Sequence, residues 1–142
     1  MGGIGRALAH RAQAFGMQIQ YHNRHKLPET EEAGGAKYVS FTELLKTSDV
    51  LSLNLSLNPE TKHIIGKKEF REMKEGIVIV NTARGPLMDE GALVEALDEG
   101  RVWAAGLDVF EGEPEIHGGL MGRENVVLLP HVGTATVETQ VC

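Results

Sequence analysis

The segment that most constrains the fold is the run 77–80, four β-branched apolar residues in a row. Such an unbroken run is typical of a parallel strand that is buried on both faces. Polar residues follow it, at the carboxyl end where open α/β sheets bind their ligands. One of them is Arg84, whose guanidinium fork suits a carboxylate. The alternative is that Arg84 only caps the turn and faces water.

Strands and helices alternate along the rest of the chain. Further short strands are expected at 17–21, 37–39, 50–55, 102–110 and 126–129. Helical spacing and cap residues predict helices that begin near Gly3, Ser40 and Asp89, and two short helices at 60–65 and 67–73. This alternation implies an α/β fold with a Rossmann-like, doubly wound parallel sheet. The first helix has no strand before it, so the sheet is expected to lack its first strand.

Composition narrows the possible partners and compartment. The 142 residues suit one domain, and the net charge of −6 argues against nucleic acid as a partner. No apolar run approaches the roughly 20 residues needed to cross a bilayer, so no membrane is expected. The single cysteine, Cys142, excludes an internal disulfide and is compatible with a reducing compartment. We therefore expect a cytoplasmic protein.

The first residues contain part of a dinucleotide-binding fingerprint. Gly2 and Gly5 fit the second and third glycines of G-x-G-x-x-G, whose first glycine would lie one residue before Met1. A helix that begins with glycines can bind phosphate, because its bare N–H groups and positive dipole end face the ligand. The alternative is an ordinary tight start of a helix.

The segment after the expected strand 17–21 bears on the choice of cofactor. Asn23 lies about where the fingerprint places its acidic ribose-binding residue, and Arg24 follows it. A neutral residue does not repel a 2′-phosphate, and Arg24 could pair with one. This favours NADP over NAD, or tolerance of both. The alternative is that Arg24 and His25 are solvated loop residues.

Three successive strands end in groups that together suit hydride transfer to a 2-oxo acid. These groups are Arg84, then Asp108 with Glu113, then His131. The arginine would bind the substrate carboxylate, and the histidine would donate a proton as hydride arrives. A carboxylate beside the histidine would stabilise its protonated form. The alternatives are a loop histidine satisfied by backbone and a turn carboxylate in water.

Several segments resemble the D-isomer-specific 2-hydroxyacid dehydrogenases. The stretches 81–85, 106–110 with Glu113-Pro114, and 129–133 are similar to the three signatures of that family, in the right order and spacing. The glycine turn at 2–6 lies in the right place ahead of them. The stretches 21–24 and 52–55 look most like the glyoxylate/hydroxypyruvate reductase branch. The resemblance covers nearly the whole chain.

The resemblance implies a role for each site residue. Arg84, Glu113 and His131 would be the catalytic residues, and Asp108 would hold the nicotinamide carboxamide. Cofactor contacts are implied for Gly2, Gly3 and Ile4 at the pyrophosphate, for Asn23 and Arg24 at the adenosine ribose, and for Thr82, Ala83, Arg84, His131, Gly133 and Thr134 near the nicotinamide. No metal is implied. The implied reaction is hydride transfer between NAD(P)H and a small 2-oxo acid of the glyoxylate/hydroxypyruvate class.

The resemblance also sets an expectation for domain organisation. Residues 1–142 would form a partial NAD(P)-binding domain, and the separate substrate domain of the family would be absent. The active-site cleft of the family closes between two domains, which excludes water. We therefore expect a truncated fragment with low or no activity alone. Homodimers are usual in the family, which sets the expectation for the full-length protein. The alternative is an NAD(P)-binding interaction or corepressor-like module without turnover.

Overall fold

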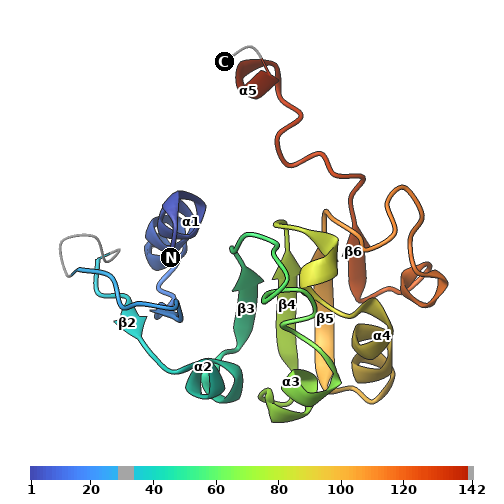
Figure 1. The fold of residues 1–142 in the computed structure, drawn as a ribbon, viewed down its shortest axis with the longest axis horizontal. Helices are drawn as coiled ribbons and strands as arrows, with labels where there is room; N and C mark the ends of the chain where they lie inside the picture. Colours follow the sequence, from blue (N-terminus) through green and yellow to red (C-terminus); the bar gives the residue numbers. More distant parts are fainter. Residues whose placement is uncertain (29–33, 141–142) are drawn as a thin grey trace.

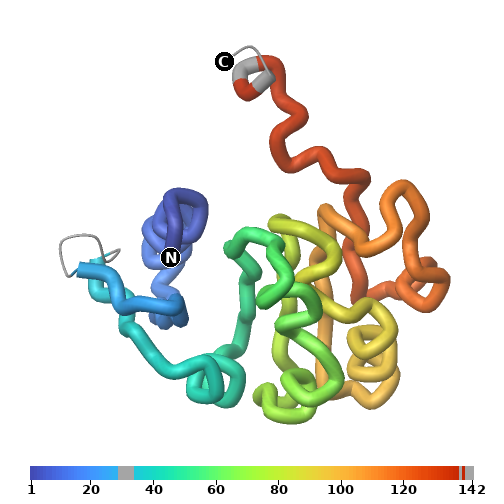
Figure 2. The backbone as a smooth tube through the Cα atoms, in the orientation of Figure 1, coloured from blue at the N-terminus to red at the C-terminus, as the bar shows by residue number. Residues whose placement is uncertain are grey.

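The computed structural model describes residues 1–28 and 34–140, so Cys142 lies outside the described residues. Figures 1 and 2 show the course of the chain. The strands are β1 (Gln20–Tyr21), β2 (Lys37–Tyr38), β3 (Val50–Leu53), β4 (Ile77–Asn81), β5 (Val102–Leu107) and β6 (Val126–Leu128). The helices are α1 (Gly3–Ala14), α2 (Phe41–Thr47), α3 (Lys67–Glu72), α4 (Glu90–Asp98) and α5 (Val137–Gln140), with short 3₁₀ turns η1 (Gly85–Leu87) and η2 (Gly118–Leu120). No described helix is long and apolar enough to cross a membrane.

All strand pairs are parallel, which confirms the predicted α/β fold class. A four-stranded sheet has the order β3-β4-β5-β6, and β1 pairs with β2 in a separate two-stranded sheet. In Figure 1, α1, β1 and β2 form one group beside β3, and the segment after β6 leads away from the body to α5. Because β4, β5 and β6 are neighbours and run the same way, their carboxyl ends meet at one edge.

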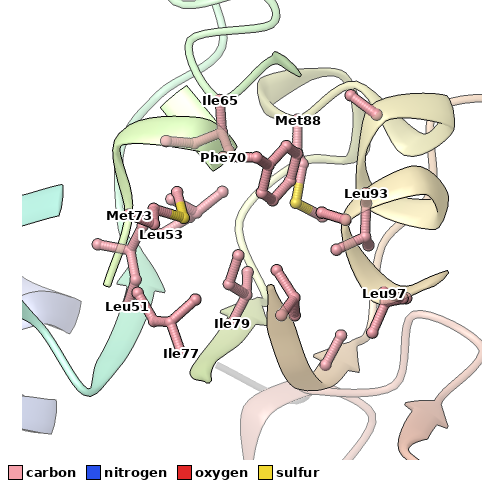
Figure 3. Packing of buried hydrophobic residues seen from close by; sticks show 14 of the residues in the cluster. Leu51, Leu53, Ile65, Phe70, Met73, Ile77, Ile79, Met88, Leu93 and Leu97 are labelled. Atoms are coloured by element: carbon pink, nitrogen blue, oxygen red, sulfur yellow. The ribbon is translucent and has the colours of Figure 1, made fainter. Parts of the chain in front are cut away.

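The helices α2, α3 and α4 cover one face of the four-stranded sheet. Their apolar residues, among them Leu45, Phe70 and Leu93, form one buried cluster with Ile77 and Ile79 of β4 (Figure 3). Burial of such side chains stabilises a fold by about 1.5–3 kcal/mol each. This cluster is the core that holds the strand ends in place.

The prediction that β4 is covered on both faces is wrong. Ile77 and Ile79 are buried, but Val78 and Val80 are only partly buried. They lie on the other face of the sheet, where a shallow apolar groove also includes the 68 % exposed Trp103. The reason is that the three helices pack on one side only.

The predicted caps of two helices are confirmed. The Ser40 side chain accepts a hydrogen bond of 3.1 Å from the Glu43 N–H and begins α2. The Asp89 carboxylate accepts one of 3.0 Å from the Ala92 N–H and begins α4. Each bond satisfies a backbone donor that the first turn of a helix leaves free. Past the end of α4, Gly100 adopts a φ of +70°, which favours glycine.

The predicted helix at 60–65 does not form. The Asn58 side chain instead accepts hydrogen bonds from the Glu60 and Thr61 N–H groups, which closes a turn. His63 then adopts a φ of +50°, outside the helical region, and Ile65 forms a bridge with Met88 beyond β4. The segment is therefore a loop that ends on the strand edge. Helix 67–73 is confirmed as α3.

The first helix forms as predicted, but its apolar residues do not enter the core. Ile4 is 77 % exposed and Phe15 86 % exposed, whereas the buried positions of α1 are Gly5 and Ala9. Gly5 faces the start of the chain and the segment after β3, because a Cβ on it would lie 3.0 Å from Cγ of Met1 and 3.6 Å from Cβ of Asn54. Helical periodicity therefore located α1 correctly, and its large apolar side chains lie outside the buried face.

Candidate active site

The candidate site lies where β4, β5 and β6 end. Leu129 N–H donates to the Leu107 carbonyl, and Asp108 N–H donates to the Asn81 carbonyl. These backbone bonds continue the pairing past the last strand residues. The segments that carry Arg84, Glu113 and His131 therefore begin side by side, as the sequence predicted.

Asn81 shapes the turn that presents Arg84. Its side chain is fully buried, and its Nδ2 donates to the Arg84 carbonyl at 3.0 Å. Its Oδ1 accepts from the Ala83 N–H at 3.1 Å. The Arg84 side chain is exposed, and its Nη1 donates to the Ala83 carbonyl at 2.6 Å. The role of Asn81 was not predicted, although a polar residue that ends a buried apolar run is a usable signal.

The Arg84 turn rests directly on the loop after β5. A Cβ placed on Gly85 would lie 1.9 Å from the carbonyl carbon of Phe110 and 2.4 Å from the Glu111 nitrogen. No side chain fits in that space, so only glycine allows this approach of the two backbones. The position of Arg84 is thus coupled to the loop that carries Glu113.

A hydrogen bond joins the side chains of Glu113 and His131. Nδ1 of His131 lies 2.9 Å from Oε2 of Glu113, and the Phe110 N–H donates to Oε1 at 2.9 Å. The hydrogen bond with His131, then the one from Phe110, holds the pKa of the Glu113 carboxyl below its usual 4.5. The charges of His131 and Arg84 lower this pKa further, and desolvation opposes them. Glu113 is therefore ionised at neutral pH.

Asp108 holds the loop that carries His131. It is 4 % exposed, and its Oδ1 accepts from the Val132 N–H at 2.8 Å. Its Oδ2 accepts from the Gly133 N–H at 2.7 Å. His131 has a φ of +56°, an uncommon conformation for a residue with a side chain, so the loop needs such support. The implied contact of Asp108 with the nicotinamide carboxamide stays a prediction.

The predicted cofactor residues fall into two groups. Gly2 and Gly3 are at the start of α1, where a Cβ would meet no protein atom within 4 Å. Packing within the protein therefore does not require glycine at these two positions. Glycine there would let a pyrophosphate approach the backbone closely. Ile4 is exposed on the same turn.

The first group of predicted cofactor residues also includes Asn23 and Arg24, which follow β1. The Asn23 carbonyl accepts a hydrogen bond of 3.1 Å from the Tyr38 hydroxyl, which ties the segment to β2. Arg24 next to it is exposed. The other group of predicted residues, Thr82, Ala83, Gly133 and Thr134, lies in the loops beside Arg84 and His131. Asn54, after β3, borders the start of α1.

Residues 1–133 match the family described as D-isomer specific 2-hydroxyacid dehydrogenase, NAD binding domain. The chain belongs to this family. The predicted resemblance is thereby confirmed. Among the described residues, no group of three or more His, Cys, Asp or Glu side chains could hold a metal ion.

Two relatives are especially similar in sequence. A putative 2-hydroxyacid dehydrogenase of Schizosaccharomyces pombe is 68 % identical over 140 residues, and 4-methyl-2-oxopentanoate reductase A of Aspergillus oryzae is 67 % identical over 141 residues. In both cases 99 % of this chain is covered, and 42 % of the relative. The chain thus spans about two fifths of the length of these dehydrogenases.

Solved structures of dehydrogenases superpose closely on the chain. A glyoxylate reductase from Paecilomyes thermophila gives a TM-score of 0.96 at 62 % identity, covering 99 % of this chain and 43 % of that one. A D-lactate dehydrogenase with NAD+ from Lactobacillus jensenii gives a TM-score of 0.88 at 32 % identity. The match covers 99 % of this chain and 46 % of that one. The family description supports binding of NAD, whereas none of these findings supports a preference for NADP.

Proposed function

We propose that the chain is the NAD(P)-binding domain, residues 1–142, and the source of the acid–base pair of a reductase that acts on small 2-oxo acids. The observation that carries the proposal is the His131–Glu113 pair, with 2.9 Å between Nδ1 and Oε2, at the sheet edge that also bears Arg84. A bound nicotinamide would supply the hydride. The acidic and cationic groups that the reaction needs all come from this edge.

Each side chain has a distinct task in this mechanism. Arg84 binds the substrate carboxylate through two parallel N–H donors and orients the carbonyl. His131 gives a proton to the carbonyl oxygen during reduction and takes it back in the reverse direction. Glu113, ionised at neutral pH, holds the ring through Nδ1 and stabilises the imidazolium. The buried Asp108 keeps the loop of His131 in place.

The similar proteins guide the choice of substrate. Their names include glyoxylate reductase and 4-methyl-2-oxopentanoate reductase, so the proposed substrates are 2-oxo acids with a short or branched side chain. NADPH is the proposed preferred cofactor, because Asn23 does not repel a 2′-phosphate and the exposed Arg24 can pair with it. A cytoplasmic homodimer remains our expectation for the whole enzyme.

The test places the chain in a complete enzyme. Residues 1–142 replace the matching segment of the Aspergillus oryzae relative, and oxidation of NADH and NADPH is followed with glyoxylate, hydroxypyruvate and 4-methyl-2-oxopentanoate. We expect turnover with at least one acid, a fall in kcat/KM of about 100-fold for Arg84→Ala, and little turnover by the 142-residue chain alone. A folded chimera that binds dinucleotide and reduces none of the acids would contradict the proposal and favour an interaction module.

A further inference from the structure

A second histidine–glutamate pair lies beside the one proposed for catalysis. Nε2 of His63 is 2.7 Å from Oε1 of Glu111, two residues before Glu113 in the same loop. Of the non-glycine residues that the structure describes, only His63 and His131 have positive φ, at 50° and 56°. Such backbone costs free energy and is retained where surrounding contacts impose it. The backbone of His63 thus adopts a conformation that its surroundings impose, and its partly exposed ring is hydrogen-bonded to Glu111.

His63 also contacts the Arg84 turn. Its backbone N–H donates to the Pro86 carbonyl at 2.8 Å, two residues after Arg84. The backbone of His63 is thus bonded to the turn that presents Arg84. Its ring is bonded to the loop that presents Glu113. Nothing in the local sequence predicts this, since His63 and Glu111 are 48 positions apart.

The backbone of Phe110 and Glu111 is the junction of these contacts. The Phe110 N–H donates to Glu113 at 2.9 Å, and the Glu111 N–H donates to the carboxylate of the buried Glu90 at 2.6 Å. Gly85 packs against the same two residues from the Arg84 side. A shift of Glu111 would therefore move Glu113 and the surface on which the Arg84 turn rests.

We propose that His63 and Glu111 are positioning residues, which hold the Arg84 turn and the Glu113 loop in the relative placement that substrate binding and proton transfer require. The inference rests on the proposed function. Neither residue needs to contact substrate: each acts through the placement of another. Misplacement of catalytic groups by about 1 Å can lower rates about 100-fold, so a small relaxation here is measurable.

The test uses a double-mutant cycle in the chimera that carries residues 1–142. His63→Asn keeps a residue that tolerates positive φ, but its shorter side chain cannot reach Glu111. Glu111→Ala removes the other partner, and Glu111→Gln keeps a hydrogen-bond acceptor. Glu115→Ala is the matched control, an exposed glutamate of the same loop. Kinetic constants are measured with glyoxylate, NADH affinity by fluorescence, and amide exchange of 108–113 by mass spectrometry.

We expect His63→Asn and Glu111→Ala each to lower kcat/KM about tenfold and the double variant to lose no more than either, because both remove one contact. NADH affinity should change less than about twofold, Glu111→Gln should retain most activity, and Glu115→Ala should match the parent. Amide exchange in 108–113 should be faster in both single variants.

Three outcomes would overturn the inference. The first is unchanged amide exchange at 108–113 in His63→Asn, and the second is a double variant whose losses multiply. A loss of NADH affinity equal to the loss of kcat/KM would also contradict it, since this would indicate general damage to the fold. A parent chimera without turnover would refute the proposed function. The amide exchange would still decide whether His63 and Glu111 hold the Arg84 turn and the Glu113 loop in place.

Discussion

Glu113 bridges His131 and the backbone of its own loop: Oε2 lies 2.9 Å from Nδ1 of the ring, and Oε1 accepts from the Phe110 N–H at 2.9 Å. One carboxylate thus holds the histidine that follows β6 against the loop that follows β5. Because Nδ1 is engaged, Nε2 is the ring nitrogen that would exchange a proton with substrate in the proposed mechanism.

The first prediction concerns the pH dependence of stability. The pKa of Glu113 is lowered in the folded chain, chiefly by the hydrogen bond with His131, so the unfolded chain binds its proton more readily. The stabilisation is therefore complete above the unfolded value, near 4.5, and is lost as pH falls through the lower folded value. Melting temperatures of the chain and of Glu113→Gln should differ most above pH 5 and converge toward about pH 3. Glu115→Gln is the control, and a difference that persists at pH 3 would contradict the assignment.

The second prediction concerns Asp108→Asn. Both carboxylate oxygens accept backbone hydrogen bonds, and an amide can offer only one acceptor while its NH2 group faces the second donor. We expect the free energy of unfolding to fall by about 1–3 kcal/mol, measured by urea denaturation. The chimera should also lose kcat, because the His131 loop is released. Asp49→Asn, at an exposed ion pair with Lys74, should cost less than about 1 kcal/mol; an equal cost at both positions would argue against the role of Asp108.

The third prediction concerns Gly85→Ala. The added Cβ would lie 1.9 Å and 2.0 Å from the carbonyl atoms of Phe110, so the two loops must separate. We expect a loss of at least about 1–3 kcal/mol in unfolding free energy, together with a loss of turnover. Gly118→Ala is the control, because a Cβ there meets nothing within 4 Å. Normal stability and activity in Gly85→Ala would show that the Arg84 turn does not depend on this contact.

The fourth prediction concerns the cofactor. Arg24→Ala should weaken binding of NADPH by about tenfold and of NADH by less than about twofold, because only NADPH carries the 2′-phosphate. Lys26→Ala removes a like charge two positions along the chain and serves as the control. Binding of both dinucleotides is measured by fluorescence titration. Equal losses for the two cofactors, or a loss of the same size in Lys26→Ala, would remove Arg24 as the 2′-phosphate partner.

Much of the fold was predictable because its causes are local. The Ser40 and Asp89 caps are set by side chains within three residues of the N–H groups that they satisfy. The apolar run 77–80 located β4, and the parallel arrangement then placed Arg84, Glu113 and His131 at one edge. The pairing of Glu113 with His131 follows from that arrangement once the strand order is known.

The sequence by itself determined where the strands lie, where α2 and α4 begin and which strand ends carry charged groups, because these depend on neighbours a few positions away. Only the tertiary structure decided which faces are buried: Val80 is only partly buried and Ile4 is exposed. It also decided the partners of Asp108 and of His63. Those contacts join segments that are 24 and 48 positions apart, so they exist only once the sheet has brought the loops together.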